Sequence, residues 1–351
     1  MVSCLEFFTM KKLTIIRANK TKFGGAERYL QRLSDELSRI GVSHDIINSP
    51  FPKWLPSWVR AILFNIYACI KKKNIYFSLE RVTCSDIYRA GDGVHKVFIQ
   101  LEHKTFLNPL HFIYIYIEKH IFTNAKKIIA ISNMVKKDII KTYNIDPGKI
   151  DIVYNGIEDI KFNYHKSFIK INKEFPIKNK KIILFVGSGY ERKGVQEFLK
   201  IVSNIDLDFM AFIIGKDKNI DFYKNLAIEL GVNDKVIFAG PRSDVYDFFT
   251  IGDIFLFPTR YEPFGNVILE AMRLKNAIFT TNRCGGGELI DKSFIFSINT
   301  QSSLVSSKIE KLLNNAKELE AIKEKNYQKS KNFTIEKNAK LTMEIINEYL
   351  H

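Results

Sequence analysis

Apolar runs rich in β-branched residues alternate with longer amphipathic segments along the first half of the chain. Such short runs indicate strands, and the segments between several of them have the spacing of helices. The predicted strands of this half span residues 13–18, 44–48, 75–79, 87–90, 127–132 and 152–154. Alternation of strands with helices predicts an α/β domain built around a parallel sheet.

The pattern restarts in the second half, where the predicted strands span residues 181–186, 209–214, 235–238, 254–257, 277–280 and 294–297. Between the two series, residues 157–180 show no sustained periodicity and include Pro176 and a lysine-rich stretch, which is typical of a connection between domains. We therefore expect a first domain at residues 1–165, a linker at 166–180 and a second domain at 181–351, with the final helix free to pack back on the first domain. Ligands of doubly wound sheets bind beyond the carboxyl ends of the strands, so we expect a site in an interdomain cleft.

Composition and charge narrow the class of protein. The chain has 351 residues, of which 46% are hydrophobic, and this excludes a disordered or collagen-like protein. Lys and Arg outnumber Asp and Glu by 53 to 38, and residues 1–165 hold 25 of these bases against 15 of the acids. The basic first domain predicts an anionic partner, and charge alone leaves nucleic acid, a lipid surface and a phosphorylated substrate open.

The cysteines and the hydropathy of the chain indicate in which cellular compartment the protein is expected. The four cysteines, Cys4, Cys69, Cys84 and Cys284, are far apart and form no C-x-x-C pair. We therefore expect neither a disulfide framework nor a zinc site, and a reducing cytosol fits this expectation. No apolar run is long enough to span a membrane, and no signal-peptide pattern opens the chain, so we expect neither export nor integration into a membrane.

The most specific motif is residues 260–272, Arg-Tyr-Glu-Pro-Phe-Gly-Asn-Val-Ile-Leu-Glu-Ala-Met, which follows a predicted strand and opens a helix. Pro263 and Gly265 favour a tight strand-to-helix loop, so Glu262 in the loop and Glu270 about one turn into the helix can face one ligand. The alternative for each carboxylate is structural: Glu262 stabilises the helix dipole and Glu270 is solvated.

A second motif follows the first strand of the second half, where Gly187 and Gly189 allow a sharp turn before Arg192 and Lys193. Two cations at the mouth of a helix suit a diphosphate, whose negative charge grows as the bond to a donor group breaks. A solvated basic turn is the alternative.

Together these two motifs resemble the signature of the family-4 retaining glycosyltransferases of GT-B architecture, and the adjoining Arg-Lys-Gly resembles the lipopolysaccharide core glucosyltransferases. The resemblance implies two Rossmann-like domains facing an interdomain cleft. It implies that Glu262 contacts the transferred sugar or the adjacent phosphate, that the backbone at Gly265, Asn266 and Val267 approaches the diphosphate, and that Glu270 binds the ribose hydroxyls.

The first domain contributes two weaker candidates. Gly24 and Gly25 follow the first strand and resemble the Gly-Gly loop of this family, although many such pairs are only turns. Residues 85–95 are dense in polar groups, and Asp92 and His95 are candidates for contact with sugar hydroxyls. A capping or hydrogen-bonded structural histidine is the alternative for His95.

Residues 51–73 contain both tryptophans, an apolar helical segment and the run Lys71–Lys73. These are the ingredients of a helix that lies in a membrane interface, and an ordinary packed helix is the alternative.

The expected function is transfer of a hexosyl unit, with retention, from a nucleotide sugar, UDP-linked by preference, to a lipopolysaccharide or lipooligosaccharide core or a related cell-envelope glycan. We expect no metal, no cofactor and no nucleic acid, and partners comprising the nucleotide sugar, a lipid-linked glycan acceptor and an anionic membrane surface. The expected location is the cytoplasm, peripheral on the inner face of the cytoplasmic membrane. A non-catalytic basic protein that binds anions or membranes, and a nucleotide-sugar epimerase of the same architecture, remain alternatives.

Overall fold

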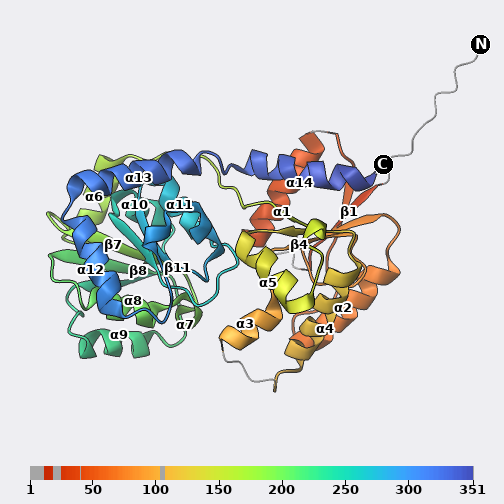
Figure 1. Cartoon of the computed structure of the whole chain (residues 1–351), viewed down its shortest axis with the longest axis horizontal. Helices are drawn as coiled ribbons and strands as arrows, with labels where there is room; N and C mark the ends of the chain where they lie inside the picture. The colour runs from red at the N-terminus through yellow and green to blue at the C-terminus, as the bar shows by residue number, and fades with distance from the viewer. Residues whose placement is uncertain (1–11, 19–24, 40, 103–106, 351) are drawn as a thin grey trace, which may run out of the picture. The chain divides into compact units, whose positions relative to one another are not determined.

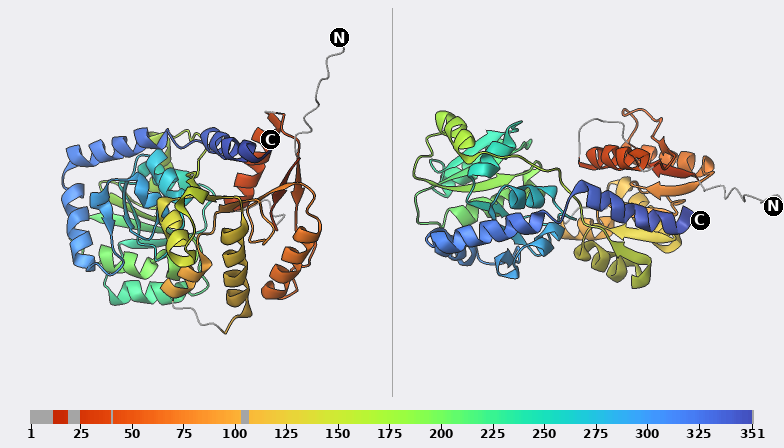
Figure 2. Two further views of the ribbon diagram at one scale, coloured as in Figure 1. Left: turned by 45° about the vertical axis from the view of Figure 1, so that its right-hand side comes forward. Right: turned by 90° about the horizontal axis from the view of Figure 1, so that it is seen from above.

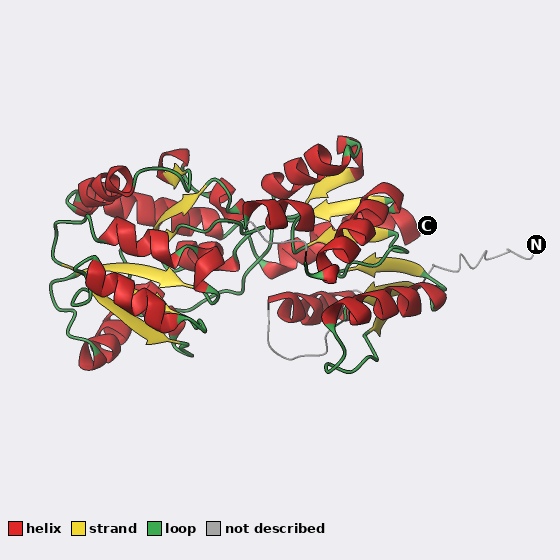
Figure 3. Ribbon diagram, turned by 90° about the horizontal axis from the view of Figure 1, so that it is seen from below, coloured by secondary structure: helices red, strands yellow, loops and turns green. Residues whose placement is uncertain are grey.

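A computed structural model describes residues 12–18, 25–39, 41–102 and 107–350 of the chain. They fall into two compact units, one of Met1–Tyr154 together with Glu336–His351 and one of Asn155–Ile335, and each is described by itself. Each unit contains a six-stranded sheet in which all pairings are parallel. Figure 3 shows the strands of each sheet in yellow between red helices.

The first unit follows the predicted alternation closely, and its strands pair in the order β2-β1-β3-β4-β5-β6. Its elements are β1 (Leu13–Ile16), α1 (Gly25–Arg39), β2 (His44–Ile47), α2 (Ser57–Ile70), β3 (Ile75–Ser78), β4 (Ile87–Ala90), α3 (His95–Leu101), α4 (Pro109–Asn124), β5 (Lys127–Ala130), α5 (Asn133–Tyr143), the 3₁₀ turn η1 (Pro147–Lys149), β6 (Ile150–Ile152) and the distant α14 (Ile335–Leu350).

The core of the first unit lies on both faces of its sheet. On one face, side chains of β1, β3 and β4 pack with Leu33 and Leu37 of α1 and with Met343 and Ile346 of α14. On the other face, Phe64 and Ala68 of α2 pack with Ile16 and Tyr76. Figure 2 shows the red α1 and the blue α14 in the view from above. The last helix of the chain therefore completes the core of the first unit.

Cys69 and Cys84 correct the cysteine expectation, because the structure joins them in a disulfide with their Cα atoms 5.5 Å apart. Cys69 lies near the end of α2 and Cys84 in the loop before β4, and they are 15 positions apart in sequence. Neither a short motif nor a repeated spacing marks such a pair, because packing of α2 against this loop brings the two residues together. Cys284 is buried and free.

The second unit has the strand order β12-β11-β10-β7-β8-β9. Its elements are α6 (Tyr164–Glu174), β7 (Lys181–Val186), α7 (Tyr190–Lys193), α8 (Val195–Val202), β8 (Phe209–Ile214), α9 (Ile220–Glu229), β9 (Val236–Gly240), α10 (Val245–Ile251), β10 (Ile254–Phe257), α11 (Asn266–Arg273), β11 (Ala277–Thr281), the 3₁₀ turns η2 (Gly285–Leu289) and η3 (Lys292–Phe294), β12 (Ile295–Phe296), α12 (Ser302–Leu313) and α13 (Ala316–Ser330).

The segment predicted as a linker at residues 166–180 differs from that expectation, because the helix α6 covers most of it and belongs to the second unit. Asn163 caps this helix by accepting a hydrogen bond from the amide of Lys166. Ile171 of α6 is fully buried, and α6 packs against α10. The lysine-rich composition of residues 166–180 suggested a linker, whereas the segment forms an amphipathic helix whose apolar face packs on the rest of the second unit.

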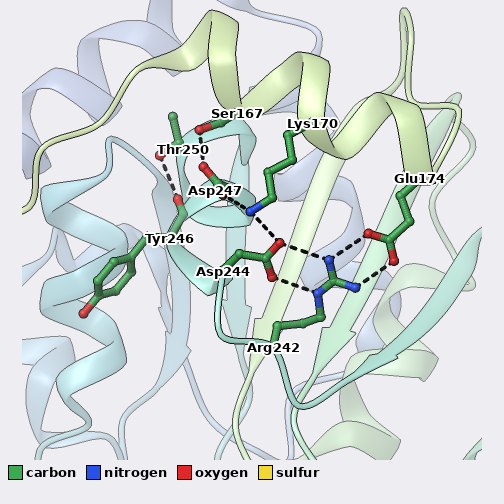
Figure 4. A network of polar contacts seen from close by, with 8 residues as sticks. All are labelled: Ser167, Lys170, Glu174, Arg242, Asp244, Tyr246, Asp247 and Thr250. Atoms are coloured by element: carbon green, nitrogen blue, oxygen red, sulfur yellow. Dashed lines mark hydrogen bonds and ion pairs between the residues drawn. The ribbon is translucent and has the colours of Figure 1, made fainter.

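A network of charged side chains reinforces this packing (Figure 4). Lys170 of α6 bonds both Asp244 and Asp247, at 2.8 and 2.6 Å. Arg242 lies between Glu174 and Asp244 and donates two bonds of 2.7 Å to the former. These contacts hold the pKa of Asp244 below its ordinary value, chiefly through the hydrogen bonds from Arg242. Charge pairing therefore anchors α6 as a part of the second unit.

Candidate functional site

The two motifs of the second unit lie at the ends of neighbouring strands. From β7 the chain builds β8 and β9 on one side of the sheet and then returns to place β10 on the other side of β7. The strand order reverses between β7 and β10, and ligands of open α/β sheets bind at such a switch point. The loop at residues 187–189 follows β7 and the loop at 258–265 follows β10, so both motifs occupy this point.

The two loops are tied together through the backbone of Arg192. Its carbonyl oxygen accepts hydrogen bonds from the amide of Arg260 at 3.0 Å and from the hydroxyl of Thr259 at 3.1 Å. Gly194 permits this approach, because it has φ +81° and a Cβ there would overlap the carbonyl oxygen of Pro258. The basic turn is thereby fixed against the loop that carries Glu262.

Glu262 is the meeting point of the two motifs. Its carboxylate accepts a hydrogen bond from Lys193 Nζ and another from Arg192 Nη1 at 3.0 Å. The side chains of Lys193 and Glu262 are only 13% and 15% exposed, while that of Arg192 is 34% exposed. The backbone of Glu262 is held as well, because its amide donates to the carbonyl of Arg283 and its carbonyl accepts from the amide of Gly285.

The electrostatics of this cluster keep the carboxylate charged. Burial by itself raises the pKa of Glu262, but Lys193 and Arg192 outweigh burial and hold the pKa below its ordinary value. With Glu262 ionised, the three side chains carry a net charge of about +1. Glu262 pairs with both cations, and the net positive charge that remains on the three side chains can attract an additional anion.

The helix α11 begins beside this cluster. Gly265 precedes it with φ +82°, a conformation that favours glycine, and within the described residues no side chain caps the helix. The first backbone N–H groups of a helix have no acceptor within the helix, so those of Asn266 and Val267 point out of its start. The side chain of Asn266 accepts a hydrogen bond from Asn155 at 2.7 Å, and Glu270 lies half-buried one turn further along.

Gly187 occupies the turn between β7 and the basic residues. Its amide donates to the carbonyl of Ile214 at 2.8 Å, which extends the β7–β8 pairing to the loop. A Cβ at this position would touch the stem of Lys193 at 3.5 Å. The glycine therefore leaves the space beside the lysine open.

The predicted residues of the first unit form a separate group. Asp92 is largely exposed and pairs with Arg81 at 3.3 Å. His95 is buried at the start of α3, with Nε2 3.0 Å from Nδ1 of His111 and its amide donating to Glu118. Burial, together with Arg81 and His111, lowers the pKa of His95 to about 3. His95 is therefore neutral near pH 7, and its contacts also agree with the structural alternative.

The remaining prediction in this unit is the Gly-Gly loop. Gly24 lies outside the described residues, and Gly25 is the first residue of α1.

Sequence analysis missed the carboxylate that organises this group. Glu118 is fully buried in α4 and accepts hydrogen bonds from Arg81 Nε at 2.9 Å, from the amide of His95 at 2.7 Å and from the hydroxyl of Tyr143 at 3.0 Å. The available signal was a single acid after the apolar run at residues 112–117, because a buried carboxylate requires partners.

No group of three or more His, Cys, Asp or Glu side chains in the described part of the chain is placed to hold a metal ion. No helix within the same residues combines the length and the apolar character that crossing a bilayer requires.

Two family models match the chain in adjacent segments. The model described as glycosyl transferases group 1 matches residues 167–329, and the model described as glycosyltransferase family 4 matches residues 88–160. The first match contains the cluster of Arg192, Lys193 and Glu262, and the second contains Asp92 and His95.

The chain is also similar in sequence to individual glycosyltransferases. Lipopolysaccharide glucosyltransferase WaaG of Escherichia coli is 28% identical over 214 residues, which are 57% of this chain and 56% of WaaG. The chain spans about half the length of the curated relatives that it matches.

Solved structures are similar over nearly the whole chain. The crystal structure of WaaG, a glycosyltransferase involved in lipopolysaccharide biosynthesis, superposes with a TM-score of 0.80 over 95% of this chain and 99% of that one, at 21% identity. Anabaena HepE in complex with UDP and glucose gives a TM-score of 0.71 over 96% of this chain and all of HepE, at 15% identity. These structures confirm the predicted pair of Rossmann-like α/β domains.

Proposed function

We propose, since the chain belongs to the glycosyltransferases of group 1 and family 4, that it transfers a hexosyl unit from a UDP-linked sugar to a cell-envelope glycan with retention of configuration. The observation that carries this proposal is the cluster of Arg192, Lys193 and Glu262 at the switch point of the second sheet. UDP is favoured because HepE, which shares the fold, was crystallised with UDP and glucose.

The second unit binds the donor in this proposal. A diphosphate needs fixed cations and free N–H groups, and Arg192, Lys193 and the start of α11 supply both. Glu262 holds the two cations in place before the donor arrives and contacts the transferred sugar or its phosphate. Glu270 accepts hydrogen bonds from the ribose hydroxyls.

The chemistry requires little from the protein beyond position and charge. Retention follows if the acceptor hydroxyl attacks from the face that the leaving group vacates, with a donor phosphate oxygen taking the proton. Charge then grows on the departing UDP, where Lys193 and Arg192 stabilise it. Removal of one such preorganised hydrogen-bond donor from an active site typically costs about 3–4 kcal/mol of transition-state stabilisation. We propose that these cations serve in place of a divalent metal and that no cofactor is used.

The first unit binds the acceptor in this proposal, and Asp92 and His95 are the residues proposed to contact sugar hydroxyls. Asp92 is accessible and still paired, whereas His95 is neutral and buried against aromatic rings. A lipopolysaccharide core or a related glycan is the favoured acceptor, because WaaG acts in lipopolysaccharide biosynthesis and another relative, CapM of Staphylococcus aureus, in capsular polysaccharide biosynthesis.

A lipid-anchored acceptor requires the enzyme to reach a membrane, and α2 offers a surface for this. Its inner face is in the core through Phe64 and Ala68. Large apolar side chains are exposed every four residues along the helix, at Trp58, Ile62, Ile66 and Ile70, and Trp54 is exposed in the turn before it. Helix α4 packs beside α2 (Figure 1) and has two exposed aromatic side chains, Phe112 and Tyr116. We propose that this surface binds the inner, cytoplasmic face of the membrane.

Charge supports the same surface. Lys71 and Lys73 follow α2 and are exposed, whereas Lys72 pairs with Asp86 at 2.8 Å. Each cation near an anionic bilayer contributes about 1 kcal/mol, which salt screens, while the tryptophan rings contribute an apolar term that salt does not remove.

Vesicle sedimentation of the full chain tests this surface. We expect Trp54→Ser with Trp58→Ser to weaken binding to anionic vesicles at both low and high salt. The matched control is Phe222→Ser with Ile228→Ser, which removes equally exposed apolar side chains from α9 of the second unit. Equal binding by the two double variants would contradict the assignment. The test uses the full chain because the first unit takes part of its core from the distant helix α14.

The enzymatic proposal is tested by UDP release from UDP-hexoses, with and without a purified core oligosaccharide. We expect UDP release that rises with the acceptor and is lost when Lys193 is replaced by Gln. A protein that binds anions without catalysis would release no UDP, and an epimerase would change the sugar without releasing UDP.

A further inference from the structure

A polar pocket of about 270 Å³ lies in the first unit. Its wall comes from segments that follow β1, β2 and β3, from the first turns of α2 and from Tyr114 of α4. The charged side chains that line it are Lys53, Arg60, Glu80 and Arg81. None of these residues belongs to the predicted site.

The pocket occupies the position in the first sheet that the donor cluster occupies in the second. The chain passes from β1 to β2 on one side and then places β3 on the other side of β1, so the strand order reverses between β1 and β3. Glu80 and Arg81 follow β3 by two and three residues, just beyond its carboxyl end. Ligands of such sheets bind at this point.

Two of the four charges are already held by protein partners. Glu80 Oε1 accepts hydrogen bonds from Arg17 Nη1 at 2.6 Å and from the amide of Ala18 at 3.3 Å. Arg81 is only 9% exposed, and it bonds Glu118 and Asp92 and lies over the ring of Tyr114. Both side chains are therefore rigid parts of the wall.

The other two charges are cations available to a ligand. Within the described residues, neither Lys53 nor Arg60 has an ion pair, and the Nε of Arg60 is buried without a hydrogen-bond partner. A buried guanidinium nitrogen without a partner is costly, and an anion would relieve this cost. Glu80 Oε2 has no hydrogen bond among the described residues and can accept one from a hydroxyl group.

A ligand that satisfies all these groups carries an anion at one end and hydroxyl groups at the other. A guanidinium and an ammonium group suit a phosphate monoester, whereas a carboxylate oxygen beside them suits a sugar hydroxyl. The volume is slightly below the range of about 300–1,000 Å³ typical of ligand sites, which favours one sugar ring over a longer glycan.

We propose that this pocket binds a phosphorylated sugar residue of the acceptor, with Arg60 and Lys53 on the phosphate and Glu80 on a ring hydroxyl. The proposal rests on the proposed function, because it names the acceptor feature that the first unit recognises. It also gives a specific use to part of the positive charge of this half of the chain.

Calorimetry of the full chain with glucose 6-phosphate, glucose and inorganic phosphate tests the pocket. We expect glucose 6-phosphate to bind more tightly than either of the other probes. Arg60→Gln should weaken it by about tenfold to a hundredfold, the loss expected for one charge-assisted contact. Lys53→Gln should act in the same direction, and Lys137→Gln, which removes an exposed cation from α5, should have no effect. Equal affinity in Arg60→Gln and Lys137→Gln would overturn the proposal.

Two further measurements separate the possible sources of failure. UDP binding measured on the same variants should be unchanged, and a wild-type chain that binds glucose 6-phosphate but not UDP would contradict the proposed function while supporting the pocket. Sedimentation with phosphatidylglycerol vesicles distinguishes a lipid phosphate. If Arg60→Gln lost vesicle binding and kept full affinity for glucose 6-phosphate, the pocket would serve a lipid headgroup and the proposal would be wrong.

Discussion

Replacement of Glu262 by Gln tests whether the carboxylate is the internal counter-ion of the proposed donor site. The change keeps the size of the side chain and removes one charge from a cluster in which Lys193 and Arg192 both bond that charge. Lys193 is nearly buried, so loss of its ion pair with Glu262 causes most of the destabilisation. Water partly stabilises the charge of the more exposed Arg192. We expect the free energy of unfolding without ligand to fall by about 2–4 kcal/mol.

The same change should act on UDP affinity in the opposite direction. In the wild-type chain the diphosphate must share the two cations with Glu262, whereas in Glu262→Gln the cations have no competing carboxylate. We expect UDP to bind about tenfold more tightly to the variant, equivalent to about 1.4 kcal/mol, and to restore part of the lost stability. Transfer should nevertheless fall, because the carboxylate that orders the cations and contacts the sugar is gone.

The assay is urea unfolding of both proteins with and without UDP, together with calorimetry of UDP binding. Glu197→Gln is the matched control, because Glu197 of the same unit pairs with Arg260 at 3.1 Å outside the cluster. Unchanged stability of Glu262→Gln combined with weaker UDP binding would refute the reasoning, because it would mean that the carboxylate does not neutralise these cations.

The pH dependence of stability gives a second check on the comparison of wild type with Glu262→Gln. The folded protein holds the pKa of Glu262 below its ordinary value, so the unfolded chain binds the proton more readily. The contribution of Glu262 to stability is therefore complete above the unfolded pKa of about 4.5 and is lost as the pH falls through the folded value. The stability difference between wild type and Glu262→Gln should shrink below that pH.

Three further changes have defined outcomes. Glu270→Ala should weaken UDP binding by about 1.5–3 kcal/mol, which calorimetry measures, and unchanged affinity in a folded variant would refute the ribose assignment. Neutralising Arg192 and Lys193 together should lower turnover more than ground-state donor affinity, because charge on the leaving group peaks in the transition state; loss of binding with normal turnover would show that the pair only docks the donor. Cys69→Ser should lower the free energy of unfolding in the oxidised protein by about 3 kcal/mol, the value for a closed loop of about 15 residues, and have a much smaller effect under reducing conditions. Equal losses under both conditions would show that the bond to Cys84 does not form.

Much of the fold could be predicted from the sequence, because each parallel strand is buried on both faces and appears as a short apolar run. The runs at residues 181–186 and 254–257 correspond to β7 and β10 without change. The two motifs proposed to bind the donor follow directly from these strands. Local sequence carries this information, since a turn and the strand before it are contiguous.

The remainder depends on contacts between distant segments. Sequence analysis allowed the final helix to pack back on the first domain, but nothing in the sequence of α14 indicates that its apolar face meets Leu33 and Leu37. The lysine-rich sequence of α6 is typical of a linker, and its role in the second unit becomes clear only from the ion pairs of Lys170 with Asp244 and Asp247. Pairing of distant cysteines and ordering of polar groups around a buried acid likewise arise only in the folded chain.

The disulfide bears on the proposed location as well. Disulfides are rare in the cytosol, so the bond between Cys69 and Cys84 argues against the proposed cytoplasmic location.

The measurement that tests the central claim most directly is the structure of the product formed from a UDP-hexose and a purified core oligosaccharide. Mass spectrometry and proton NMR of the acceptor after incubation with the full chain give both the mass and the anomeric configuration. The account predicts an acceptor that gains one hexosyl unit in the anomeric configuration of the donor, in an amount equal to the UDP released. UDP release with no change in the acceptor, or a product of inverted configuration, would contradict it.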